Sequence, residues 1–132
     1  MVDPMKRKTI NFILLLICFS ILFSGCSSLR RPVNLSPTSY DAAMNILDIT
    51  DQYLDGKITA VYAAGQTQNL CNILETLPET AGTQESSVKN YSELIAHMFM
   101  LLAEGDPVEI SELIQTRNYL ATLLGERTII QK

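Results

Sequence analysis

Few side chains in this sequence have a type and spacing suited to chemistry. The candidates are three cysteines and one histidine: Cys18, Cys26, Cys71 and His97. No Ser-His-Asp set, HExxH motif or glycine-rich phosphate loop accompanies them. We therefore expect a protein that is not an enzyme.

His97 and a row of aspartates are the candidates for metal binding. His97 is expected on the face of its helix opposite the apolar stripe, near Glu93, and a single histidine without a cysteine partner is a poor ligand set. Asp41, Asp48 and Asp55 recur every seven residues, which places them about 10 Å apart along a helix. That spacing is too long for one cation. We predict solvated helix faces, and no metal or cofactor.

Cys71 has no partner for a disulfide within the domain that follows Cys26. A lone thiol outside the cytoplasm could form an intermolecular disulfide or react with oxidants. We favour the alternative that Cys71 is a small buried apolar residue.

Cys26 stands at the end of an organised N-terminal segment. Translation could begin at Met1 or Met5, and a basic cluster follows at residues 6–8. The apolar run from Ile10 to Phe23 would be roughly 21 Å long as a helix. A bilayer core of about 30 Å needs a longer span, so the run suits the apolar region of a signal peptide. The small residues 24 and 25 would let a peptidase approach the backbone.

The segment Leu22-Phe23-Ser24-Gly25-Cys26 resembles the lipobox of bacterial lipoproteins. Phe23 departs from the Leu, Val or Ile that is usual there. The resemblance implies cleavage between Gly25 and Cys26, and lipidation of Cys26 with diacylglycerol and an acyl group such as palmitate. It places the protein on the outer side of the cytoplasmic membrane, or at an outer membrane in a Gram-negative host. The alternative is an uncleaved signal anchor in which Cys26 is an ordinary thiol.

The composition after the segment 1–25 indicates one small acidic domain. Without Lys6, Arg7, Lys8 and Asp3, the chain keeps 7 basic and 13 acidic side chains, a balance of −6. Such a surface argues against nucleic acid as a partner. The membrane, through the lipid anchor, and another envelope protein are the expected partners.

The pattern of the remaining chain predicts an all-α domain. Residues 26–38 are rich in Ser and Pro and indicate a flexible tether, and residues 39–132 form the domain. Four helices are expected, at 39–55, 60–77, 87–104 and 107–124. Asp106 should cap the last helix, with Pro107 in its first turn and Glu109 completing a capping box. Residues 126–132 form a tail in which Ile129 and Ile130 could pack back.

Short turns at Gly56 and Gly105 require antiparallel neighbours, so the four helices should form two hairpins of a small antiparallel bundle. Val61 and Met100 project away from the predicted core, and we expect them to mark a surface that binds a partner. The favoured function is an interaction or structural module of the envelope. The alternative is a carrier that holds a small apolar molecule between the hairpins, in a cavity lined by Leu70, Met98 and Phe99.

Overall fold

The computed structural model describes residues 34–78 and 83–130, all within the unit Arg31–Lys132. Within this described part the regular elements are four helices: α2 (Pro37–Leu54), α3 (Ala60–Glu75), α4 (Gln84–Ala103) and α5 (Ile110–Leu124). None of them is long and apolar enough to cross a membrane. The predicted signal segment, with Gly25 and Cys26, lies outside the described residues.

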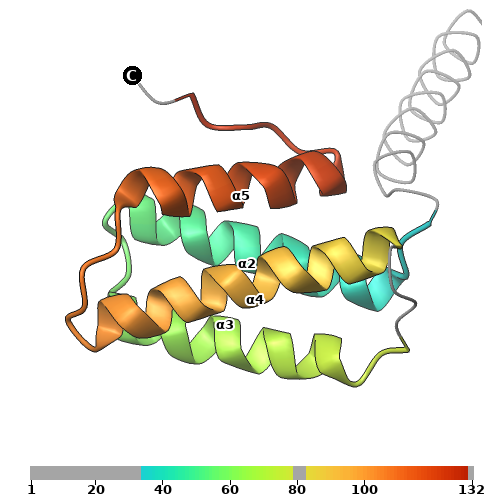
Figure 1. Cartoon of the computed structure of the whole chain (residues 1–132), viewed down its shortest axis with the longest axis horizontal. Helices are drawn as coiled ribbons and strands as arrows, with labels where there is room; N and C mark the ends of the chain where they lie inside the picture. Colours follow the sequence, from blue (N-terminus) through green and yellow to red (C-terminus); the bar gives the residue numbers. More distant parts are fainter. Residues whose placement is uncertain (1–33, 79–82, 131–132) are drawn as a thin grey trace, which may run out of the picture. The chain divides into compact units, whose positions relative to one another are not determined.

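The helices form an antiparallel bundle, as the sequence predicted (Figure 1). Helices α2 and α4 contact each other, and each also contacts both α3 and α5. Helices α3 and α5 lie on opposite sides of this central pair. The most extensive contact is between α3 and α4, which belong to different hairpins. The bundle is therefore held together mainly across the hairpins.

Three helices begin at a hydroxyl side chain. Ser36, Thr59 and Thr83 each accept a hydrogen bond from a backbone N–H three residues later. Such N-caps satisfy donors that have no partner within the helix. Helices α2 and α4 thus start two and three residues earlier than predicted. Because Leu35 is buried in the core, residues 35–38 belong to the fold and not to the expected tether.

Three helices end at a glycine in the left-handed conformation. Gly56, Gly105 and Gly125 have φ angles of 75°, 84° and 75°. In each case the N–H of the following residue donates to a carbonyl five positions back, at 2.8–2.9 Å. This is the Schellman arrangement, which favours glycine because other residues are strained at positive φ. The predicted helix ends at these glycines are confirmed.

The predicted start of α5 is wrong. The helix begins at Ile110 with Glu109 as its N-cap, and no side chain makes a capping hydrogen bond there. The predicted capping box needs the N–H of Asp106 as a donor to Glu109. That N–H already donates to the Leu101 carbonyl, 2.9 Å away, to close α4. The Asp106 N–H that the capping box of α5 would need is thus already used at the end of α4.

Several of the residues that α3 and α4 bury are small. Helix α3 buries Ala63, Thr67, Cys71 and Leu74, while the apolar residue Ile73 is exposed. On α4, Ser92, Ala96 and Phe99 are buried and Leu94 is exposed. Small side chains let these two helices approach closely, so the larger side chains lie at the flanks of the contact.

Candidate functional site

Helix α5 carries a cation on its buried stripe. Arg117 lies in register with the core residues Leu113, Leu120 and Leu124, and its side chain is 8% exposed. A guanidinium is always protonated and is costly to remove from water unless it is paired. The contacts of Arg117 therefore identify a structured polar site at the edge of the core.

Asp51 of α2 is the partner of this cation. The Nε and Nη2 atoms of Arg117 donate to the two carboxylate oxygens of Asp51, over 2.8 and 2.9 Å. This two-point geometry is the strongest form of an Arg–carboxylate pair, and it orients the guanidinium plane. The pair also ties the last helix of the bundle to the first.

The Nη1 group of Arg117 donates to the Asn118 Oδ1 over 3.3 Å and also binds the main chain of the C-terminal segment. The same Nη1 donates to the Arg127 carbonyl over 2.6 Å. Asn118 next to it contacts Ile129 twice: its Nδ2 donates to the Ile129 carbonyl, and its Oδ1 accepts from the Ile129 N–H, both over 2.8 Å. We call Asp51, Arg117 and Asn118 the tail seat, and residues 126–130 the tail.

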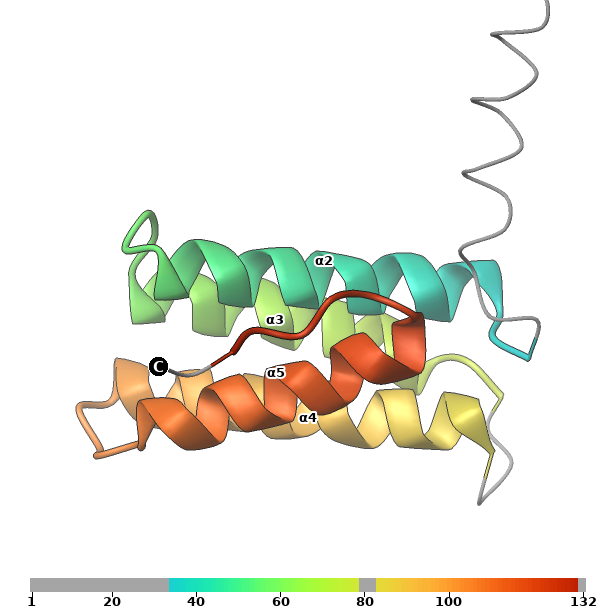
Figure 2. The ribbon, with the colours of Figure 1, turned by 90° about the horizontal axis from the view of Figure 1, so that it is seen from above.

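The tail runs back along α5 on the side of α2 (Figure 2). The predicted packing is confirmed in part: Ile129 is partly buried, whereas Ile130 is 85% exposed. Main-chain hydrogen bonds to the seat therefore hold the tail more than burial of its side chains does.

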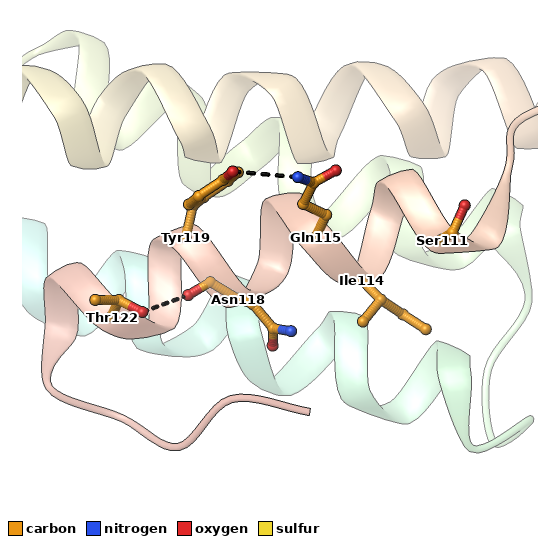
Figure 3. Close-up of a pocket in the computed structure, with 6 residues that line it drawn as sticks. All are labelled: Ser111, Ile114, Gln115, Asn118, Tyr119 and Thr122. Carbon is orange, nitrogen blue, oxygen red and sulfur yellow. Dashed lines mark hydrogen bonds between the residues drawn. The ribbon is translucent and has the colours of Figure 1, made fainter. Parts of the chain in front are cut away.

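An open hollow of about 500 Å³ lies along α5 beside the tail seat (Figure 3). Its lining is uncharged: Ser111, Ile114, Gln115, Asn118, Tyr119 and Thr122. Asn118 points toward the tail, and Gln115 and Tyr119 point to the opposite side of the helix. Gln115 donates to the Tyr119 hydroxyl over 3.1 Å, and the Tyr119 ring stacks on Tyr91 of α4 at 5.4 Å. One wall of the hollow is thus an ordered aromatic surface.

The predicted partner residues lie elsewhere, on α3 and α4. Val61 is 68% exposed and Met100 is 43% exposed. Met100 lines a hollow of about 170 Å³ between the two helices, together with Gln68. Val61 precedes Gln68 by seven residues, so it lies about 10 Å further along the same side of α3. The structure thus leaves both residues accessible, along one seam.

Cys71 and His97 border that smaller hollow. Cys71 is a free thiol that is buried, as predicted. Burial raises its pKa to about 11, and the carboxylates of Glu93 and Glu75 act in the same direction. His97 is exposed, as predicted. Among residues 34–78 and 83–130, no group of His, Cys, Asp and Glu side chains could hold a metal ion.

The three residues expected to line a ligand cavity, Leu70, Met98 and Phe99, lie in different surroundings, and Met98 is partly buried against the core. Phe99 is fully buried and meets the ring of Tyr53 edge-on, with 5.1 Å between centroids. Leu70 lines a surface hollow of about 300 Å³ between α2 and α3, where amide side chains and Asp48 predominate. Gln52 donates to Asp48 there, over 2.7 Å.

The sequence analysis missed Asp51, Arg117 and Asn118. One signal could have indicated the first two: Arg117 interrupts the apolar stripe of its helix, and Asp51 lies off the acidic row of Asp41, Asp48 and Asp55. A charge on a buried face needs a partner of opposite sign, and Asp51 lies at the edge of the buried face of α2. No family model, curated protein or solved structure matches this chain. The tail seat is therefore interpreted from its own geometry.

Proposed function

We propose that this chain is a lipid-anchored protein of the bacterial envelope, and that its helical domain binds another protein. The lipobox-like segment ending at Cys26 supports the anchor. Each buried CH₂ of an attached acyl chain contributes about 0.8 kcal/mol, so a lipid with two chains holds a protein stably at a membrane.

The observation that carries the binding role is the tail seat with the open hollow beside it. Helix α5 presents an uncharged hollow with an aromatic wall at Tyr119. Beside it, Arg117 and Asn118 already bind a segment of polypeptide through its backbone. The polar groups of the seat bind a polypeptide backbone, and the hollow beside them has room for side chains. Together these features favour a protein as the ligand.

The alternative function, a carrier for a small apolar molecule, has less support. It requires an apolar cavity between the hairpins, and Phe99 fills that region of the core. An enzyme would bring nucleophiles, acids and bases together in a cleft. The α5 hollow contains amides, hydroxyls and Ile114, so we favour binding over catalysis there.

Two surfaces could contact the partner, and site-specific photo-crosslinking distinguishes them. A benzophenone amino acid would replace Gln115 in the α5 hollow, Met100 on the α3–α4 seam, or exposed Asp41 on α2 as the matched control. Each variant would be expressed in cells with native Cys26 and with Cys26→Ala. Lipidation would be followed by the incorporation of labelled palmitate.

We expect the native chain to incorporate labelled palmitate and Cys26→Ala to incorporate none, because the substitution removes the thiol that would be acylated. A discrete adduct should form from position 115 and not from position 41, and only in the anchored chain. An adduct from position 100 alone would move the binding surface to Val61 and Met100. Absence of palmitate from the native chain, or equal labelling of the two forms, would refute the lipid anchor at Cys26.

A further inference from the structure

We infer that the tail seat is a binding site for an extended peptide segment of another protein, and that the chain's own tail occupies the seat as a competitor. The inference rests on the proposed function and gives its ligand a chemical class. It draws on the contacts of Arg117 and Asn118, the exposure of the tail and the room beside it.

The seat contacts one edge of an extended backbone. In an extended chain, the N–H and C=O groups of alternate residues point to the same side. The three contacts are the Arg127 carbonyl, the Ile129 N–H and the Ile129 carbonyl. They match this alternation, and none of them involves a side chain of the tail. The seat therefore fits any segment that presents an extended edge, as in other cases of main-chain recognition.

The seat is organised by contacts outside the tail. Asp51 fixes the Arg117 guanidinium through two hydrogen bonds, and Asn118 projects from the adjoining position of a helix. Groups held in place before binding do not lose conformational freedom when a ligand arrives. The seat is thus ready for a replacement segment when the tail departs.

The tail is a poorly buried occupant. Arg127 and Thr128 are exposed, Ile129 is partly buried and Ile130 is 85% exposed. Its main-chain hydrogen bonds to the seat are favoured by the covalent link to α5, which gives the tail a high effective concentration. A segment that buried more surface could displace it.

The hollow beside the seat offers that surface. It provides about 500 Å³ along α5, with Ile114 and Tyr119 as its apolar members and no charged side chain in its lining. A segment that fills it would carry uncharged side chains, including an apolar or aromatic one near Tyr119. The predicted ligand is therefore an extended, uncharged peptide with one large apolar side chain.

The test releases the tail and offers a peptide in trans. Ile129→Pro in the full chain removes the N–H that donates to Asn118. A stop after Glu126 removes the tail residues that contact the seat but keeps the Glu126 N–H that closes α5. The probe is a fluorescent octapeptide, GERTIIQK, with the sequence of residues 125–132. Binding would be measured by anisotropy with detergent-solubilised chains whose helicity is verified by circular dichroism.

We expect the probe to bind both released variants at least tenfold more tightly than the native chain. Adding Asn118→Ala to Ile129→Pro should abolish binding, whereas adding Asn90→Ala, an exposed asparagine on α4, should leave it unchanged. A probe methylated on the amide nitrogen equivalent to Ile129 should not bind. Probes with one residue replaced by Phe should include at least one tighter binder.

Two results would overturn the inference. One is a folded Ile129→Pro chain that binds neither the probe nor its Phe-substituted forms, or that binds the methylated probe equally well. The other is a dimer of the native chain that the probe dissociates, because the seat would then serve a second copy. The titration needs no membrane, so loss of the lipid anchor would refute the proposed location without changing this result.

Discussion

Cys71 combines deep burial with two acidic neighbours, and both suppress its ionisation. The pKa of the thiol rises from 9.0 to about 11 through burial and through the carboxylates of Glu93 and Glu75. The reactive form of cysteine is the thiolate. At pH 8, the folded state should therefore contain roughly a hundredfold less thiolate than the unfolded state.

We predict that Cys71 reacts with iodoacetamide at pH 8 at least about a hundredfold more slowly in the folded chain than in urea. The measurement uses a chain with Cys18→Ala and Cys26→Ala, so that one thiol remains. Because the folded state keeps the proton longer, stability should also fall as the pH rises from 9 to 11. The Cys71→Ala variant should lack this component of the fall. Rapid labelling of the folded chain would mean that the α3–α4 contact opens readily.

Hydrophobicity alone identifies buried residues least well where small residues determine the packing. Cys71 is buried as predicted, and the polar residues Thr67 and Ser92 are also fully buried, while the apolar residues Ile73 and Leu94 are exposed. The Thr67 hydroxyl donates to the Ala63 carbonyl over 2.8 Å, which explains how a polar residue is accommodated. A periodic count of apolar residues does not include such local hydrogen bonds.

Helices α2 and α5 are joined by the Asp51–Arg117 pair, and the contribution of this pair to stability can be measured. Removing one partner leaves the other charge without compensation at the edge of the core, which typically costs 3–5 kcal/mol for a fully buried pair. Asp51 is 38% exposed. We therefore predict a loss of about 2–3 kcal/mol for Asp51→Asn or Arg117→Met in urea unfolding.

The double variant Asp51→Asn with Arg117→Met should recover part of this loss, because no charge is then left unpaired. Lys57 and Asp55 provide the control, since they form an ion pair at 3.9 Å with both side chains more than 60% exposed. Neutralising that pair should change stability by less than about 1 kcal/mol. Additive losses in the Asp51–Arg117 double variant would show that the two residues act independently.

The ends of helices were more predictable than their faces. Glycine at Gly56, Gly105 and Gly125 marks a backbone conformation that few other residues adopt, so the signal is local. The start of α5 depended on whether the Asp106 N–H was available, which is decided by the preceding helix. Likewise, the pairing of Arg117 with the tail needs both segments in place. The bundle could be predicted from local patterns, whereas the tail seat arises from contacts distant in sequence.

At the scale of the whole molecule, Glu85 near the start of α4 is hydrogen-bonded to the start of α2. Its Oε1 accepts from the Ser36 N–H over 2.7 Å and from the Ser39 hydroxyl over 3.4 Å. These hydrogen bonds, first of all the one from the Ser36 N–H, hold the pKa of Glu85 below its usual 4.5. Its contribution to stability should be present above pH 4.5 and lost as the pH falls below it.

We predict that Glu85→Gln lowers the melting temperature by a few degrees at pH 7. The difference from the native chain should shrink between pH 4.5 and pH 2.5, since protonation removes the same carboxylate from the native chain. Glu109→Gln is the control, because Glu109 makes no capping hydrogen bond. A difference that stays constant down to pH 2.5 would exclude ionisation of Glu85 as its cause.

The tail seat joins side chains that are 66 residues apart in sequence, Asp51 and Arg117. Because synthesis runs from the N-terminus, Asp51 is made long before Arg117 and the tail. A nascent chain that ends before Arg117 lacks the seat, even if its first helices have formed. Under the proposed function, a partner that recognises the seat would bind only chains that already contain α5. Binding of that partner would then begin only after α5 has been synthesised.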